Sequence, residues 1–310
     1  MEKYIFVISL ALLLSSCSNG NSDNADLNNK ESSWPPAAEN VNPDSYGYIV
    51  DSEVMGLRYK SGEHFGVTDL NGKFGYIEGQ KIQFYVGDIS IGSEVEPLSK
   101  LTPYDLAEGN ADLAITITQF LQTLDDDALP SNGISINESV HLLAEQVDLD
   151  LTSSGWTDNP IAVDRDIQNV MFELTSATEA GSRYLVSRYS AYLHFAETLD
   201  EIIDELEFNI VEVVEQTSCE TAEQCVIVEL RPKYSGYCPL PGRMLIYSQL
   251  DINLGSFNSS VNERNTLIDV REELEDSVVE DYPITGVCLI SRAIPFEICN
   301  DQQRCEIQYY

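Results

Sequence analysis

After residue 45, hydrophobic positions first follow a period of two. Ile82, Phe84 and Val86 alternate with polar or small residues, which is typical of a strand with one buried face. Shorter apolar runs precede this segment, and Asn71-Gly72 separates two of them. Because both residues of Asn-Gly tolerate positive φ, this dipeptide predicts a hairpin. Residues 46–95 therefore predict compact β structure.

The hydrophobic period changes to that of a helix in residues 96–206. Asn110 is a favourable N-cap, and one helical face follows it: Leu113, Ile117, Phe120, Leu121 and Leu124. Three further faces come from Val140, Leu143 and Val147 after Asn137, from Ile167, Val170, Met171 and Leu174, and from Tyr192, Ala196, Leu199, Ile203 and Leu206 after Ser190. Four amphipathic helices predict a small helical bundle.

Residues 207–310 return to a β pattern. Apolar runs at 210–214 and 226–230 flank Cys219 and Cys225, and similar runs flank Cys299 and Cys305. Each arrangement predicts a hairpin whose loop is closed at its base by a cysteine pair, which suggests a weak internal duplication. Further strands are predicted at 244–247 and 287–290, and one helix at 266–278.

The N-terminus has the features of a secretory signal. A short charged start is followed by an apolar run over residues 5–14 and then by Leu-Ser-Ser-Cys17. The run is shorter than the roughly 20 residues that a transmembrane helix needs. Leu-Ser-Ser-Cys resembles the bacterial lipobox, which implies cleavage after residue 16 and lipidation of Cys17. The alternative is an ordinary signal peptide with an incidental cysteine.

The lipobox resemblance also implies a location. Several acyl chains on Cys17 would give a lasting membrane anchor. In lipoproteins of this kind, Ser18 in place of aspartate favours the outer membrane. We therefore expect a lipid-anchored protein of the cell envelope, with the membrane as its first partner.

Residues 17–45 predict a disordered tether, because Ser, Asn, Asp, Gly and Pro dominate them and few apolar side chains are available for burial. Trp34-Pro35-Pro36 is the one unusual feature of this segment. We interpret it as part of a linker, with a contact site as the alternative.

Charge narrows the classes of partner. The chain carries a net charge of −35, and removal of residues 1–16 takes away one Glu and one Lys and leaves that value unchanged. Nucleic acid is excluded as a partner, since phosphates require clusters of Lys and Arg. Solubility is our preferred explanation for the acidity, and bridging by divalent cations is the alternative.

The cysteines predict a disulfide framework in an oxidising compartment. Apart from Cys17, all of them lie in the last third: Cys219, Cys225, Cys238, Cys288, Cys299 and Cys305. The spacing Cys-x5-Cys occurs twice, so we predict the pairs 219–225 and 299–305, and by remainder 238–288. A zinc site is the weaker interpretation, because its cysteines are usually spaced two to four residues apart.

The β segment carries a family resemblance. The motifs are Asp51-Ser-Glu-Val-Met-Gly-Leu-Arg-Tyr, Gly66-Val-Thr-Asp-Leu-Asn-Gly-Lys-Phe-Gly-Tyr and Gly79-Gln-Lys-Ile-Gln-Phe-Tyr-Val-Gly-Asp-Ile. They are similar to small prealbumin-like β-sandwiches, such as the carboxypeptidase regulatory-like and Cna B-type domains. These modules serve as spacers or binding platforms, so the resemblance implies that residues 46–95 form a small β-sandwich.

A second resemblance extends this first one. The β motifs together with Glu96-Pro-Leu, Leu101-Thr-Pro and Leu121-Gln-Thr-Leu-Asp-Asp-Asp…Asn132-Gly-Ile resemble an uncharacterised group of Gram-negative outer-membrane lipoproteins. The likeness covers about residues 46–206 and implies no particular activity.

No catalytic motif stands out. The chain contains neither Gly-x-Ser-x-Gly nor His-Glu-x-x-His, and we interpret His64, His141 and His194 as packing or surface residues. Asp125, Asp127 and Asn132 are the best candidates for a metal site, since calcium prefers clustered oxygen ligands. The EF-hand order fails here, and an acidic loop at a helix end is the alternative. We expect no other cofactor.

Taken together, these patterns predict a multidomain α+β protein: a small β-sandwich, a helical middle region and a disulfide-linked β-rich C-terminal domain. We expect a non-enzymatic envelope or surface protein whose C-terminal domain binds a protein or glycan partner. The alternatives are a secreted hydrolase that uses paired carboxylates on polysaccharide and a structural envelope protein without a soluble ligand.

Overall fold

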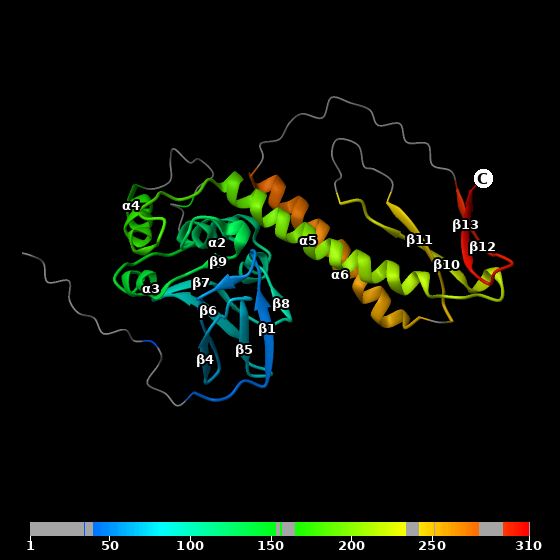
Figure 1. Cartoon of the computed structure of the whole chain (residues 1–310), viewed down its shortest axis with the longest axis horizontal. Helices are drawn as coiled ribbons and strands as arrows, with labels where there is room; N and C mark the ends of the chain where they lie inside the picture. The colour runs from blue at the N-terminus through cyan, green and yellow to red at the C-terminus, as the bar shows by residue number, and fades with distance from the viewer. Residues whose placement is uncertain are drawn as a thin grey trace, which may run out of the picture. The chain divides into compact units, whose positions relative to one another are not determined.

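The computed structural model describes residues 34, 40–152, 156, 165–233, 242–250, 252–278 and 294–309. It confirms a mixed α+β fold with a small β-sandwich, a helical middle and disulfides near the C-terminus (Figure 1). None of the helices in these residues is long and apolar enough to cross a membrane. The leader and Cys17 lie outside the described residues.

Two sheets form the sandwich. The first has the order β5-β1-β8, with β1 at Ser45–Ile49, β5 at Lys73–Tyr76 and β8 at Lys100–Leu101. The second has the order β4-β3-β6-β7, with β3 at Arg58–Ser61, β4 at His64–Val67, β6 at Ile82–Val86 and β7 at Ile89–Val95. Tyr59, Phe74 and Phe84 meet between the sheets, with the Phe74 and Phe84 ring centroids 5.2 Å apart.

The prediction of a hairpin at Asn71-Gly72 is wrong. Strands β4 and β5 flank this dipeptide, but β4 pairs with β3 and β5 pairs with β1, so the chain passes from one sheet to the other. Gly72 does take a positive φ of 71°. The Asp69 carboxylate holds the turn by accepting the N–H groups of Asn71 and Lys73. The predicted turn is therefore present, but only Gly72 of the dipeptide takes a positive φ, and the strands on either side of the turn belong to different sheets.

Ordered structure begins before residue 46. The Asn40 amide donates to the Phe65 carbonyl oxygen, and the N–H of Asp44 donates to that of Tyr76. The segment predicted as tether through residue 45 is therefore part of the β structure from residue 40.

Helix α2, at Ala111–Leu124, forms as the sequence predicts, and the Asn110 side chain caps it by accepting the N–H of Leu113. The helix is buried along almost its whole length because sheet residues cover one side and other helices the other. Short α1, at Pro103–Leu106, precedes it with a capping box at Thr102. One continuous set of buried side chains, here called the sandwich core, joins both sheets to α2 and its neighbouring helices.

The smaller helices of the middle region lie beyond α2. Strand β9, at Ile134–Ser135, pairs in parallel with β2, at Val54–Met55. Asn137 caps α3, at Glu138–Ala144, as predicted. Helix α4, at Arg165–Leu174, buries Ile167, Met171 and Leu174. The helices pack on one another and also on the sandwich, because α2 contacts strand β7 as well as α5 and α6.

Helix α5 corrects two predictions. It runs over Arg188–Glu215, so residues 210–214 are helical and not a strand, and the helix continues across the boundary expected at residues 206 and 207. Ser187, not Ser190, is its N-cap. Ile210 and Val214 are four residues apart and both buried. Their β-branched side chains suggested a strand, but their spacing fits the buried face of a helix.

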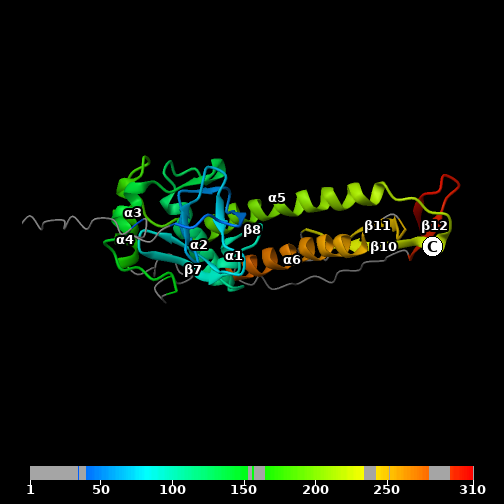
Figure 2. The same ribbon diagram turned by 90° about the horizontal axis from the view of Figure 1, so that it is seen from below.

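The C-terminal region builds its own small core. Strand β10, at Cys225–Leu230, pairs with β11, at Arg243–Ser248, and helix α6 covers Leu254–Val278, starting well before the predicted residue 266. Helices α5 and α6 run side by side (Figure 2). We define the C-terminal core by its buried residues: Ile210, Val214, Leu230, Leu245, Tyr247, Phe257 and Val261.

The predicted cysteine pairing is wrong. Cys219 is bonded to Cys299, and Cys225 to Cys305, with a sequence separation of 80 in each case. The hairpin of β12, at Pro295–Cys299, and β13, at Cys305–Tyr309, forms as expected. Its cysteines nevertheless bond to Cys219, which precedes β10, and to Cys225, the first residue of β10, so the hairpin is not closed on itself and no duplication exists there. The predicted pair Cys238–Cys288 lies outside the described residues.

Candidate functional site

A hollow of about 550 Å³ lies where α5 passes the turn between β1 and β2. We call it the α5 hollow. Its lining comes from the β1 edge, the loops around it and one face of α5: Tyr48, Val50, Ser52, Glu53, Asn71, Lys100, Ser131, Thr198, Glu201, Ile202 and Glu205. The hollow is open to solvent and mostly polar.

Charge in the α5 hollow is predominantly negative. Glu53, Glu201 and Glu205 contribute carboxylates, and Lys100 is the one cation among the lining residues. The Lys100 Nζ lies 2.7 Å from the Glu205 Oε2, and both side chains are exposed, so this pair contributes about 1 kcal/mol or less. Tyr48 remains 40% exposed and supplies an aromatic surface. Neutral or cationic ligands therefore suit the hollow better than anionic ones.

Ser52, in the lining of the α5 hollow, contacts the histidine His194 behind it. The Ser52 Oγ lies 3.0 Å from the His194 Nε2, although the two residues are 142 positions apart in sequence. His194 is on α5, one turn before Thr198, whose hydroxyl accepts the N–H of Ser52 at 3.0 Å. Ser52 takes a left-handed φ of 59°, which a non-glycine residue adopts only when its surroundings hold it there.

The buried side chain of Asp51 holds the same turn against α2. Its carboxyl is fully buried and receives hydrogen bonds from the Gln122 Nε2 at 3.4 and 3.2 Å. Desolvation raises the pKa of Asp51 to about 8, so the group is protonated at neutral pH. Gln122 lies on α2, and thus α2 and α5 together fix the turn that carries Ser52.

Burial also affects His194. Desolvation is the largest cause of its lowered pKa, opposed by a backbone hydrogen bond with Asp51 and by the charges of Glu197 and Glu201. The ring is therefore neutral at neutral pH. A neutral imidazole in contact with a hydroxyl is able to accept that hydroxyl's proton.

The predicted calcium residues do lie together, next to a second hollow of about 410 Å³. The Asp125 carboxylate accepts the N–H groups of Leu129 at 2.8 Å and Ser135 at 2.9 Å. Asp127 accepts the N–H of Leu129 and the Asn132 amide, each at 2.9 Å. These bonds shape the loop that follows α2.

The two aspartates also differ in the direction in which their pKa values are shifted. Desolvation raises the pKa of Asp125 to about 6, whereas hydrogen bonds from Asn132 and Leu129 lower that of the exposed Asp127. Among the described residues, only the sulfurs of Cys219, Cys225 and Cys305 form a group of three close enough to share a metal ion, and they are in disulfides. The acidic loop has an evident structural role, and calcium stays a prediction.

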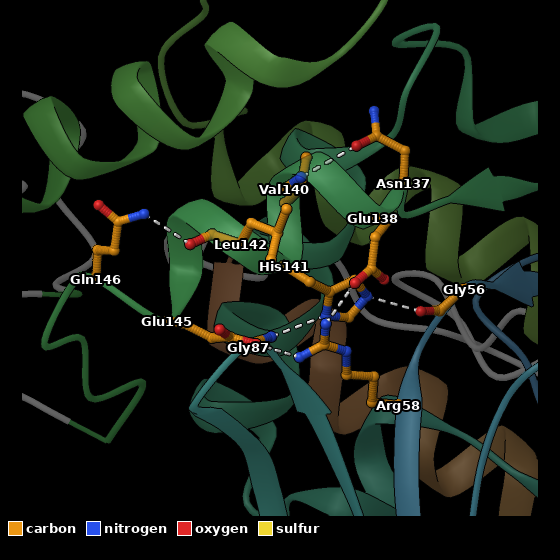
Figure 3. Close-up of polar contacts among 10 residues, drawn as sticks. All are labelled: Gly56, Arg58, Gly87, Asn137, Glu138, Val140, His141, Leu142, Glu145 and Gln146. Atoms are coloured by element: carbon orange, nitrogen blue, oxygen red, sulfur yellow. Dashed lines mark hydrogen bonds and ion pairs between the residues drawn. The ribbon is translucent and has the colours of Figure 1, made fainter. Parts of the chain in front are cut away.

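A buried ion pair lies where the sandwich meets α3 (Figure 3). The Arg58 guanidinium contacts the Glu145 carboxylate at 2.6 Å and the Glu138 carboxylate at 2.8 Å. Arg58 and Glu145 are each 1% exposed, whereas Glu138 is 66% exposed. The pair ties β3 to α3 and lines none of the hollows described here.

His141, on α3, also contacts the sandwich near this ion pair. Its Nδ1 accepts the N–H of Gly87 and its Nε2 lies 2.8 Å from the Gly56 carbonyl oxygen, which fixes the neutral tautomer (Figure 3). Burial is the largest cause that lowers the pKa of His141 to about 4. His64 is also buried, with its Nδ1 2.7 Å from the Val41 carbonyl oxygen. Both histidines are thus packing residues, as predicted.

Trp34 packs against the second sheet. Its ring lies 5.9 Å from that of Phe65 and 6.5 Å from that of Tyr85, and the Arg58 guanidinium carbon lies 5.7 Å from its centroid. Trp34 is therefore in contact with the β-sandwich of its own chain.

The sequence did not reveal the Ser52–His194 pair. No local motif marks it, since the partners come from a β turn and a helix far apart in the chain. The α5 hollow has no sequence signature for the same reason. Comparisons of the chain with protein-family models, with curated proteins and with solved structures gave no match.

Proposed function

We propose that the protein is a lipid-anchored protein of the outer membrane that binds a neutral glycan in the α5 hollow. The observation that carries the proposal is the composition of this hollow. An exposed aromatic ring, Tyr48, stands beside the Asn71 amide and the carboxylates of Glu53 and Glu201. Sugar hydroxyls pair with such donors and acceptors, while an aromatic face covers the apolar side of a sugar ring.

The ligand site is proposed here and not in the C-terminal region, where the sequence predicted the partner contact. Charge supports a neutral ligand, because the lining carboxylates and the net charge of −35 repel anionic glycans. The anchor rests on the leader pattern and the lipobox resemblance at Cys17. The tether would allow the hollow to sample ligands near the membrane surface.

A binding experiment with a matched control tests the glycan site. The full chain is titrated with a panel of neutral and acidic oligosaccharides, and binding is measured by calorimetry. We expect Tyr48→Ala to weaken binding of a neutral glycan at least about tenfold, equivalent to about 1.4 kcal/mol. Tyr46→Ala is the control, since Tyr46 is also an exposed tyrosine, at 55%, but lies outside the hollow. The Lys73 Nζ is 4.0 Å from the centroid of its ring. Equal losses in both variants, or binding of acidic glycans only, would refute the proposal.

The anchor has its own test. Mass spectrometry of the mature protein should find Cys17 as a lipidated N-terminus, and Cys17→Ser should release the protein from the membrane fraction. A chain that retains its leader with an unmodified Cys17 would contradict the anchor without affecting the glycan site.

A further inference from the structure

The serine–histidine pair of the α5 hollow differs from the chain's other histidine contacts. His141 is bonded to main-chain groups through both nitrogens, and the His64 Nε2 lies 3.5 Å from the Tyr59 phenol oxygen. Of the three histidines, only His194 meets an aliphatic hydroxyl, and that hydroxyl lines a hollow.

The backbone at Ser52 is also unusual. Its left-handed φ is held by the N–H bond to Thr198 and by the buried Asp51 that precedes it. Strained φ/ψ values persist where the surroundings over-determine them, and they concentrate at functional sites. A serine presented on a tight, clamped turn next to a helix-borne histidine has the arrangement that nucleophilic catalysis needs.

We propose that Ser52 is a nucleophile activated by His194, and that the α5 hollow cleaves carboxylic esters, such as acyl groups carried on a saccharide. The Ser52 Oγ attacks the ester carbonyl carbon while its proton passes to the His194 Nε2. The ester C–O bond then breaks, and the alcohol leaves with that proton. Water attacks the acyl-serine, His194 again carries the proton, and the carboxylic acid is released as Ser52 is regenerated.

The tetrahedral intermediate of this reaction carries an oxyanion, which requires hydrogen-bond donors. The Ser52 N–H is bonded to Thr198 and is not one of them. Lys100 and Asn71 line the same hollow and carry donor groups on their side chains. Substrate entry is open, because the hollow faces solvent.

This inference goes beyond ligand binding and does not depend on the identity of a glycan. A reactive serine is detected by a small covalent probe whether or not a saccharide binds. Failure of the glycan panel would leave Ser52 reactivity untouched, and an inert Ser52 would leave glycan binding untouched.

The test is covalent labelling of the full chain with a short alkyl fluorophosphonate, followed by peptide mapping of the adduct. We expect a single adduct on Ser52, none in Ser52→Ala, and full labelling in Ser90→Ala, a control on exposed Ser90 of β7. His194→Gln keeps a polar side chain but no base, so labelling should slow by at least about 100-fold, the lower range for loss of a general base.

Two outcomes would overturn the proposal. One is the absence of a Ser52 adduct on the folded wild-type chain, and the other is unchanged labelling in a folded His194→Gln variant. If that variant does not fold, Ser52→Cys replaces it, with Ser90→Cys as its control. Alkylation of Cys at position 52 should then be faster than at position 90, because a neighbouring histidine favours the thiolate, and equal rates would count against activation.

Discussion

The two cores of the molecule are stabilised in different ways. The sandwich core joins both sheets to several helices and contains a cluster of aromatic rings. The C-terminal core has seven buried residues and does not extend to the β12–β13 hairpin, in which no residue is fully buried. Two disulfides attach that hairpin to Cys219 and to Cys225 at the start of β10. Where little apolar surface is available, covalent links take the place of burial.

Removing the covalent links gives the sharpest test of this difference. Replacement of Cys219, Cys225, Cys299 and Cys305 by serine should detach the β12–β13 hairpin, because an isolated two-stranded hairpin is marginal in water. Each disulfide spans 80 residues, and closing the first such loop is worth about 4 to 5 kcal/mol in the chain-entropy model. Hydrogen exchange of residues 295–309 should become fast.

The sandwich serves as the internal control in that experiment. Exchange of residues 82–86 should remain slow, because neither of the two disulfides removed here involves a residue of the sandwich core. Persistent protection of residues 295–309 would show that packing, not the disulfides, holds the hairpin.

Truncation of a buried ring compares the two cores directly. Phe84→Ala should cost about 4 to 5 kcal/mol, because Phe84 is fully buried against Phe74 and Tyr59. Phe257→Ala should cost about 3 kcal/mol, since Phe257 lies in the smaller core against Tyr247, with ring centroids 4.6 Å apart. Denaturant unfolding followed by circular dichroism measures both. A larger loss for Phe257 would reverse the proposed ranking.

The Arg58 cluster tests the polar part of the sandwich region. Glu145→Gln should destabilise the protein by about 3 kcal/mol, because it removes the negative charge that lies 2.6 Å from the buried Arg58 guanidinium. Glu138→Gln is the matched control and should cost less than about 1 kcal/mol, since Glu138 is 66% exposed. Thermal melting distinguishes the variants, and equal effects would mean that burial does not set the strength of this cluster.

Asp51 gives the smallest expected effect, and one that depends on pH. Its pKa is about 8 in the folded chain against a usual value of 3.8, so the folded state binds the proton more tightly. The associated stability is fully present below pH 3.8 and is lost as the pH rises towards 8. Asp51→Asn has no such dependence.

The stability of Asp51→Asn relative to wild type should therefore increase between pH 4 and pH 8. We expect an increase of at least about 1.4 kcal/mol, the equivalent of one pKa unit. Melting at several pH values measures the difference, and other titrating groups cancel in it. A difference that stays constant over this range would mean that Asp51 is charged in the folded chain.

Local signals in the sequence predicted local structure well. Asn110 and Asn137 cap their helices as expected, and the alternating residues 82, 84 and 86 form β6. The predictions that failed concern which segments contact one another. The composition of residues 210–214 is compatible with a strand or with a helix. They form a helix, whose buried residues Ile210 and Val214 belong to the C-terminal core.

The candidate site shows the same difference between local signals and long-range contacts. Acidic residues close together in sequence, such as Asp125 and Asp127, were correctly expected to lie close in space. Ser52 and His194 meet only because α5 packs across the β1–β2 turn, and no spacing in the sequence encodes that contact. The disulfides failed for a similar reason, since short sequence spacing suggested bonds within each hairpin.

The crossed disulfides have a consequence for biogenesis. Cys219 and Cys225 would leave a translocation channel together, well before Cys299 and Cys305, if the chain is exported from its N-terminus. Short loops close quickly, so oxidation in order of emergence favours a bond between the first two cysteines. Reaching the native connectivity then requires that this early bond be exchanged, which makes maturation dependent on a thiol–disulfide isomerase and not only on an oxidase.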